Sequence, residues 1–324
     1  MIYPWQEVSW KDVTESWGEL PNAWLFYSAP NTGSLEWVKE YAQALLCREP
    51  MLPNHRPCNQ CLSCRLFCQG MHPDFHLVSN DQFLQEGIHQ PVIKISMVRE
   101  VTEKVQLSSH LGGWKVVLIH PAEAMNIQAS NALLKALEEP PHRTIFLLLT
   151  TTKEALLPTI ISRCRKFSLP KPTQEEALAY LTSLNPDEEG MRFQLALNSG
   201  MPFFNPDFPQ GIYQDFIQLM CQPRLLELLD FSQKYSVTIN SLAYFYDWIY
   251  KWLADMILVN AGYEVKFHLL AQEEILHTGG RYPLEELFGL LALIKKGLRS
   301  SAQSLNLRLQ IESILLEYLL LTVG

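Results

Sequence analysis

The chain has 324 residues, of which 48% are hydrophobic, and its formal net charge is −8. This length allows two or three domains with a substantial core, and the composition excludes an intrinsically disordered protein. Because binding to nucleic acid rests largely on neutralising phosphates, the acidic balance argues against a protein that binds nucleic acid on its own.

The N-terminal residues 1–6 contain no basic region followed by an apolar stretch, so we expect no signal peptide. No apolar run approaches the roughly 20 residues that a membrane helix needs. We therefore expect a cytoplasmic protein without a membrane partner. The seven cysteines are an odd number, and most lie in one short stretch. In a reducing compartment such a group indicates metal binding rather than disulfides.

The first half of the chain alternates strand-like and helix-like segments. Apolar and β-branched runs predict buried strands, and apolar residues at helical spacing predict the helices between them. The predicted strands are 23–27, 74–78, 115–120, 144–150 and 165–169, and the predicted helices are 35–46, 95–105 and 126–137. This alternation predicts an α/β domain with a parallel sheet covered by helices on both faces.

The second half is predicted to be helical. Pro170 and Pro172 indicate a hinge, after which residues 174–199 have the pattern of a small helical piece. A second break contains Pro202, Pro206 and Pro209. Beyond this break, apolar stripes at helical spacing indicate a helical core or a subunit interface.

The segment Ser28–Leu35 has the layout of a phosphate-binding loop between a strand and a helix. A working loop reads G-x-x-x-x-G-K-[ST], in which the lysine reaches the outer phosphates and the hydroxyl holds magnesium. Here Gly33 is kept, but Ser34 occupies the lysine position and Leu35 the Ser/Thr position. The segment is therefore a degenerate loop that we do not expect to bind ATP tightly.

The acidic residues of an ATP site are missing as well. In ATPases of this layout a hydrophobic strand ends in Asp-Glu, which organise magnesium and the attacking water. Here the strand ends in His120-Pro121. We interpret Glu123 as a solvated residue at a helix start, and Thr151 as the residue at the position of a γ-phosphate sensor. Together these losses predict a chain that does not hydrolyse ATP.

The tripeptide Ser162-Arg163-Cys164 follows a buried strand and precedes the hinge. An arginine at a subunit edge can stabilise charge on a neighbour's γ-phosphate, which increases the rate by about 10³–10⁵. We interpret Arg163 as such a trans-acting arginine finger, carried by a motif that includes Ser162 and Cys164. The alternative is a surface arginine in an ordinary salt bridge.

The cysteines Cys47, Cys58, Cys61 and Cys64 follow the pattern C-x10-C-x2-C-x2-C. Four thiolates at about 2.3 Å satisfy tetrahedral zinc and leave no open position, so the predicted site is structural. Cys47 ends an apolar helix and suits a fixed ligand position, although Cys68 could replace it. Unliganded cysteines are the alternative, and a redox role is weaker because the thioredoxin-type context is absent.

Several longer motifs accompany the cysteine pattern and Ser162-Arg163-Cys164. They are His72-Pro73-Asp74, Val-Arg-Glu-Val at 98–101, Leu-Gly-Gly-Trp-Lys-Val-Val at 111–117, and Asn-Ala-Leu-Leu-Lys-Ala-Leu-Glu-Glu-Pro-Pro at 131–141. Together they resemble the delta-prime subunits of bacterial DNA polymerase III clamp loaders, a family of AAA+ proteins. The resemblance covers roughly residues 24–169, and residues 305–310 are similar to the family's collar region.

The resemblance implies an AAA+ domain at residues 1–169 with a zinc module at about 47–68. It also implies a helical lid domain at 170–207 and a helical collar or oligomerisation domain at 208–324. In such a ring of five subunits, the gamma or tau motor subunits bind ATP, and the ring, which includes delta, loads the sliding clamp onto primed DNA. This chain would then be an ATP-inert part of a DNA-directed DNA polymerase, a nucleotidyltransferase complex, with structural zinc and no ATP of its own.

Two other functions stay open from the sequence. One is an active clamp-loader ATPase in which Lys39 or Lys115 replaces the missing lysine, and it predicts ATP turnover by the isolated chain. The other is a zinc-stabilised DNA-binding protein without a motor partner, and it predicts salt-sensitive DNA binding. Motor subunits keep an intact loop and Asp-Glu, so the losses at Ser34, Leu35 and His120-Pro121 favour a delta-prime subunit.

Overall fold

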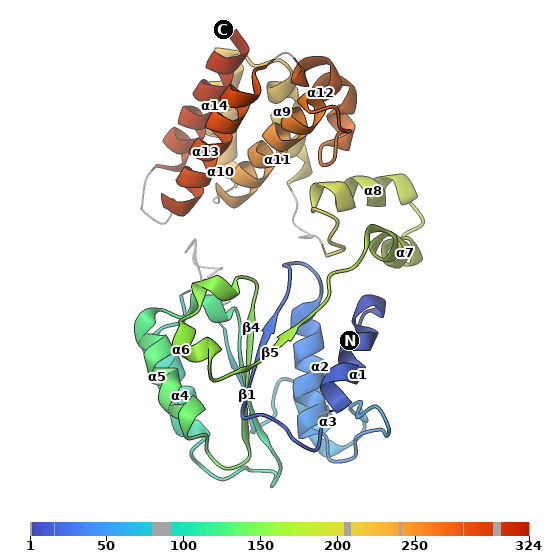
Figure 1. Ribbon diagram of the computed structural model, residues 1–324, viewed down its shortest axis with the longest axis vertical. Coiled ribbons are helices and arrows are strands. Elements are labelled where there is room, and N and C mark those ends of the chain that lie inside the picture. Colours follow the sequence, from blue (N-terminus) through green and yellow to red (C-terminus); the bar gives the residue numbers. More distant parts are fainter. Residues whose placement is uncertain are drawn as a thin grey trace. The chain divides into compact units, whose positions relative to one another are not determined.

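The computed structural model divides the chain into two compact units, residues 1–176 and 177–324 (Figure 1). It describes residues 2–15, 17–79, 92–203, 209–239, 242–280, 282–300 and 306–323. The first unit is an α/β domain, and the described secondary-structure elements of the second unit are all helices. The predicted boundary at 207/208 lies outside the described residues, so the division into three domains stays a prediction.

A five-stranded parallel sheet forms the centre of the first unit, in the order β2-β3-β4-β1-β5. The buried strands β3 and β4 pair with Val117 opposite Phe146, and β1 joins them with Leu25 opposite Leu148. The strands are β1 (Ala23–Tyr27), β2 (Phe75–Val78), β3 (Lys115–Ile119), β4 (Thr144–Thr150) and β5 (Arg165–Ser168). All five predicted strands are confirmed, with ends that differ by at most one residue.

Helices cover both faces of this sheet, which confirms the predicted fold class (Figure 1). One face packs against α4 (Ile95–Lys104), α5 (Ile127–Glu138) and α6 (Pro158–Ile161). The other packs against α1 (Glu7–Glu15) and α2 (Ser34–Leu46). Shorter helices complete the unit: η1 (Pro4–Gln6), α3 (Leu62–Cys68), η3 (Ala122–Ala124) and η4 (Lys153–Ala155).

Aromatic side chains hold α2 on the sheet. Trp37 of α2 packs edge-on against Phe26 of β1, with 5.4 Å between ring centroids, and stacks on Phe167 of β5 at 6.1 Å. Tyr41, one helical turn further along, stacks on Trp37 and meets the edge of Trp24. Because α2 follows the degenerate loop directly, this cluster also determines where that loop lies.

The motif His72-Pro73-Asp74 connects the segments around the sheet. The buried Asp74 carboxylate accepts hydrogen bonds from the amides of His110 (2.8 Å) and Leu111 (2.9 Å) and from the Ser109 hydroxyl (3.0 Å). His72 Nδ1 accepts from the Asp74 amide, which leaves Nε2 to donate to the Ser63 hydroxyl at 2.8 Å. The motif therefore joins the loop before β3 to helix α3.

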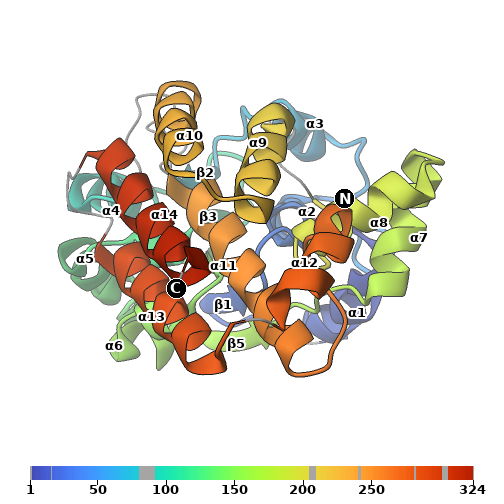
Figure 2. The same ribbon diagram turned by 90° about the horizontal axis from the view of Figure 1, so that it is seen from above.

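The second unit contains a helical pair followed by a helical bundle. The pair is α7 (Gln174–Leu184), which begins just before the unit boundary, and α8 (Glu188–Leu197). The remaining elements are α9 (Gln210–Cys221), α10 (Leu225–Thr238), α11 (Leu242–Asn260), η5 (Leu269–Ala271), α12 (Gln272–Gly279), α13 (Leu284–Ser300) and α14 (Leu307–Val323). Figure 2 shows α11 passing through the middle of the bundle, and its apolar side chains form much of the core. Among the described residues, no helix combines the length and apolarity needed to cross a membrane.

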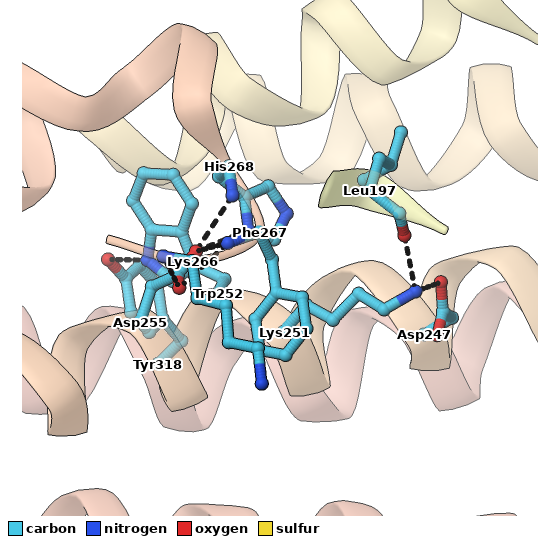
Figure 3. Close-up of polar contacts among 9 residues, drawn as sticks. All are labelled: Leu197, Asp247, Lys251, Trp252, Asp255, Lys266, Phe267, His268 and Tyr318. Atoms are coloured by element: carbon cyan, nitrogen blue, oxygen red, sulfur yellow. Dashed lines mark hydrogen bonds and ion pairs between the residues drawn. The ribbon is translucent and has the colours of Figure 1, made fainter. Parts of the chain in front are cut away.

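Buried charges on α11 secure the neighbouring segments (Figure 3). The Asp255 carboxylate accepts from the amides of Lys266 (2.8 Å), Phe267 (3.1 Å) and His268 (2.8 Å), and lies 3.1 Å from the His268 ring. Lys251 Nζ donates to the Leu197 carbonyl at 2.6 Å. Since Leu197 ends α8, this bond fastens the helical pair to the bundle.

We expect Asp74→Asn to lower the free energy of unfolding by about 1–3 kcal/mol, because the amides of His110 and Leu111 lose an ionised acceptor. Burial opposes ionisation of Asp74, but the bonds from Leu111, His110 and Ser109 outweigh it, so its pKa is lowered. This contribution is present above the unfolded value of about 3.9 and is lost as the pH falls through the lower folded pKa.

The measurement is urea unfolding of the first unit at pH 7 and again near pH 3. Asp12→Asn changes an exposed aspartate of α1 and serves as the control. Equal stability of Asp74→Asn and the wild type at pH 7 would contradict the expected role of the carboxylate.

Candidate functional site

The degenerate loop, residues 28–35, turns between β1 and α2. Gly33 caps α2 with a φ of 76°, and Asn31 also has a positive φ of 58°. The buried Thr32 hydroxyl donates to the Ala29 carbonyl at 2.9 Å and lies 2.6 Å from the Ser34 hydroxyl. The hydroxyls of Thr32 and Ser34 thus pair with each other, and Leu35 packs against the core on this side of the sheet.

The N-terminal helix η1 contacts the same loop, which the sequence did not predict. Trp5 Nε1 and Gln6 Nε2 each donate to the Thr32 carbonyl at 3.2 Å. All three residues are buried. A single tryptophan and a single glutamine carry no motif, so no sequence signal identified this contact.

The end of β3 differs from the sequence interpretation. Glu123 is half-buried rather than solvated, and its Oε1 accepts from the amide (3.0 Å) and the hydroxyl (2.6 Å) of Thr151. Burial opposes ionisation of this carboxyl, but the bond from the Thr151 hydroxyl, with weaker ones, outweighs it and lowers the pKa. The predicted exposure was wrong because β3 and β4 are neighbours in the sheet, so their ends meet, whereas Glu123 does lie in the first turn of η3 as expected. His120-Pro121 follows β3 and is a cis peptide.

Lys115 does not lie where a substitute for the loop lysine would be needed. It begins β3, whereas the degenerate loop follows the end of the parallel strand β1. Its buried ammonium group donates to the carbonyls of Val105 and Leu107, at 2.5 and 2.7 Å. Lys115 is therefore a structural residue at the opposite edge of the sheet.

Arg163 lies just after α6 with its side chain 35% exposed. Its guanidinium forms an ion pair with Glu138, the last residue of α5, and donates to the Thr159 carbonyl at 3.0 Å. In this chain alone, the arginine is therefore held by its own subunit. Glu138 belongs to the motif at 131–141, and Arg163 belongs to Ser162-Arg163-Cys164. The presence of both motifs in the sequence was the only signal that these two residues could meet.

The neighbours of Arg163 have structural surroundings. The Ser162 hydroxyl donates to the Thr159 carbonyl at 3.0 Å, which closes the short helix α6. Cys164 is buried in the core beneath α5 and α6, and burial raises the pKa of its thiol to about 12. A thiol that stays protonated is a poor nucleophile. Cys164 therefore anchors the segment that presents Arg163.

The four predicted cysteines lie together, with their sulfur atoms all within 4.8 Å of one another. The Sγ–Sγ distances are 3.5 Å from Cys47 to Cys58, 4.0 Å from Cys47 to Cys61, and 3.9 Å from Cys58 to Cys64. A tetrahedron with zinc–sulfur bonds of about 2.3 Å has edges of about 3.8 Å, so the cluster fits this ion.

Backbone amides also favour thiolates in this cluster. The amides of Cys58, Cys61 and Cys64 each donate to the sulfur of the preceding cysteine in the cluster, at 3.3 to 3.5 Å. Burial opposes ionisation of Cys61, but the amides of Cys64 and Arg48 outweigh it and lower its pKa to about 6. Burial raises the pKa of Cys47 and of Cys64. Because their pKa values are raised, these two thiols would need a bound metal ion to stabilise their thiolate forms.

Cys47 and Cys68 occupy different surroundings. Cys47 is the C-cap of α2, as the sequence indicated, and belongs to the cluster. Cys68 ends α3, is exposed, and accepts a hydrogen bond from Gln43 Nε2 at 3.5 Å. Of the two candidates for the fourth position, Cys47 is therefore the one placed beside the other three thiols.

Comparison with known families agrees with the motifs. The sequence profile of the family described as "DNA polymerase III, delta subunit" matches residues 10–173, about half of the chain. The chain belongs to this family. DNA polymerase III subunit delta' of Pseudomonas aeruginosa is 37% identical over 203 residues, which cover 62% of this chain and 59% of that protein. The Escherichia coli K12 subunit delta' is 33% identical over 223 residues, covering 68% and 64%. The matched part thus spans about 60% of the length of these relatives.

Other relatives extend this picture. DNA polymerase III subunit tau of Bacillus subtilis is 30% identical over 166 residues, covering 51% of this chain and 28% of tau. Among solved structures, a DNA polymerase III gamma subunit-related protein of Thermotoga maritima is 20% identical over 97% of this chain and 98% of its own, with a TM-score of 0.46. Because this score is low, the family assignment rests on the sequence.

Proposed function

We propose that this chain is an ATP-inert subunit of a bacterial DNA polymerase III clamp loader, which helps to load the sliding clamp onto primed DNA. Two facts together carry the proposal. The chain belongs to the family, and its loop has Ser34 and Leu35 in place of the lysine and the magnesium ligand. Neither residue supplies the charge or the metal ligation that ATP hydrolysis needs.

The polar contacts around the loop support an inert site. Thr32 pairs with Ser34, and Thr151 pairs with Glu123. In an ATPase, groups at these places would interact with phosphates, magnesium or water. Here they bond to one another, so a nucleotide would have to break both pairs without gaining a lysine.

We further propose that Arg163 completes the ATP site of a neighbouring motor subunit. Its partial exposure and its place after a short helix support this role, because the guanidinium can leave Glu138 without unfolding a core segment. The planar guanidinium can donate two parallel hydrogen bonds, so arginine pairs with a phosphate as well as with a carboxylate. In this proposal Glu138 holds the guanidinium until the neighbour's γ-phosphate replaces the carboxylate.

The C-terminal helix supports assembly with gamma or tau and delta subunits. Ile311, Leu315 and Tyr318 of α14 pack into the bundle core, whereas three leucines at spacings of seven and four residues are exposed: Leu309, Leu316 and Leu320. Such a stripe suits helix packing between subunits. A protein in this complex would act in the cytoplasm and would meet the clamp and primed DNA through its partners.

The four clustered cysteines are proposed to hold a structural zinc ion. Four thiolates would leave no open position for a substrate or water, and the ion would stabilise the surrounding segment rather than take part in a reaction. The bond from the Ser63 hydroxyl to the Leu46 carbonyl, at 2.6 Å, supports a fixed geometry because it ties α3 to the end of α2.

We expect Arg163→Ala to depress DNA-stimulated ATP hydrolysis by a reconstituted clamp loader. The rate of ATP hydrolysis at the site that the arginine completes should fall by a factor of roughly 10³–10⁵. The other ATP sites of the complex should keep their rates. The control is Arg192→Ala, which removes an exposed arginine of α8 that pairs only with Glu188 among the described residues. Unchanged hydrolysis by an intact Arg163→Ala complex would leave Arg163 a structural residue.

The isolated chain separates the competing functions. We expect it to show no ATP turnover and no strong, salt-sensitive binding to primed DNA. Turnover would indicate a motor subunit with an unusual loop, whereas tight DNA binding that weakens steeply with salt would indicate a nucleic-acid binder. Co-purification with gamma, tau or delta is expected only for the clamp-loader subunit.

We expect one zinc ion per chain, measured by elemental analysis of the purified protein. Cys58→Ser and Cys61→Ser should each abolish stoichiometric zinc, because three thiolates remain. Cys68→Ser is the matched control and should keep the ion, since Cys68 lies outside the cluster. Loss of zinc from the Cys68 variant, with zinc retained by Cys47→Ser, would reassign the fourth ligand.

A further inference from the structure

The N-terminal helices η1 and α1 touch the degenerate loop at one end. Trp5 and Gln6 supply two buried donors to the Thr32 carbonyl. Thr32 directly precedes Gly33, the cap of α2. A bound phosphate would normally order such a loop through its amides. Here two side chains from another segment hold the loop through its carbonyl instead.

The same helices also touch the cysteine module, through residues Glu7 and Trp10. Trp10 Nε1 donates to the Asn54 carbonyl at 2.7 Å, and Glu7 pairs with Arg56 at 2.7 Å. The Arg56 guanidinium lies 4.8 Å from the centre of the Trp10 ring. Asn54 and Arg56 lie between the first two cysteines of the cluster, in the segment 48–57.

A further aromatic contact strengthens this end. Trp17, which follows α1, stacks on His55 of the same segment, with 4.6 Å between ring centroids. The segment 48–57 contains no helix or strand, and its residues contribute nothing to the described hydrophobic cores. Its shape therefore depends on these contacts, on the flanking cysteines, on the bridge between Met51 and Arg56, and on the hydrogen bond from Arg48 to the Leu111 carbonyl.

Two connections thus join the loop to the cysteine module. Trp5 and Trp10 are five residues apart, which corresponds to about 8 Å along a helix. The second connection is α2, which begins after Gly33 and ends at Cys47. The two connections are packed together, because the Trp10 ring meets Trp37 at 5.6 Å.

We propose that metal binding at the four cysteines orders the degenerate phosphate loop through the N-terminal helices. The inference rests on the proposed zinc site. With the ion bound, the segment 48–57 is closed at both ends and presents Asn54 and Arg56 to α1. Without it, these anchors loosen, the constraint that they place on η1 weakens although α1 stays packed in the core, and the two donors bond to the Thr32 carbonyl less often. The bound metal would then order this loop, as a bound nucleotide orders the loop of an active subunit.

Two indole N–H protons can be used to follow the contacts of the N-terminal helices with the cysteine module and with the loop. The Trp10 indole proton reports the cysteine module, and the Trp5 indole proton reports the loop. In protein labelled with ¹⁵N-tryptophan, Trp5→Phe and Trp10→Phe identify the two signals. We expect removal of zinc with a chelator to shift both signals and to speed exchange of the Trp5 indole proton about three- to tenfold.

A variant tests the connection without removing the metal. Trp10→Phe deletes the bond to Asn54 but keeps an aromatic ring against Trp37. We expect it to speed exchange of the Trp5 indole proton by a similar factor while zinc content stays at one ion per chain. Val8→Ala is the control, because Val8 belongs to the same helix and is 68% exposed. It should leave the Trp5 signal unchanged.

The outcomes separate the two proposals. If zinc removal shifts the Trp10 signal but leaves the Trp5 signal unchanged, the coupling is wrong and the zinc site stands. If elemental analysis finds no zinc, the zinc site is wrong and metal coupling fails with it, whereas Trp10→Phe still tests the mechanical connection. If the amides of β3 and β4 lose protection together with Trp5, the loss is global unfolding, which also overturns a specific coupling.

Discussion

The packing of α2 against the sheet determines the position of both candidate sites. One end of this helix carries the loop that would meet a nucleotide, and the other end carries the first cysteine of the cluster. Trp37 and Tyr41 join it to β1 and β5 through edge-on and stacked contacts. Aromatic pairs of this kind add about 0.5–1.5 kcal/mol each beyond the burial of their surface. A displacement of α2 would therefore be costly and would move both sites together.

The degenerate loop has a shape that contacts within the loop and with helix η1 support. Active phosphate loops leave their amides open to a ligand, so part of their order arrives with the nucleotide. In this chain the hydroxyls of Thr32 and Ser34 are paired, and a carbonyl of the loop is held by Trp5 and Gln6. If the chain binds no nucleotide, as proposed, the loop would keep one shape throughout. In the proposed complex, this constant shape would contrast with subunits that bind and hydrolyse ATP.

Local signals in the sequence were enough to predict the sheet and the cysteine cluster. The strand Thr144–Thr150 was predicted to the residue because a continuous apolar run needs burial on both faces. Cys47 was recognisable because it ends an apolar helix. The sequence could not show that Glu123 meets Thr151 or that Trp5 meets Thr32, since these pairs come together only through the order of the strands and the path of the N-terminus. Neither pair has a periodic pattern or a motif, so only the tertiary structure identifies them.

The ion pair between Arg163 and Glu138 also makes any outside ligand of Arg163 a competitor. Glu138 ends α5, where the aligned peptide dipoles place partial negative charge. The arginine offsets both that charge and the carboxylate. When another anion takes the guanidinium, the carboxylate is left facing the negative end of its own helix. Engagement of the arginine and stability of the last turn of α5 are therefore thermodynamically linked, and each opposes the other. An anion that binds Arg163 would therefore destabilise the last turn of a helix that covers the sheet.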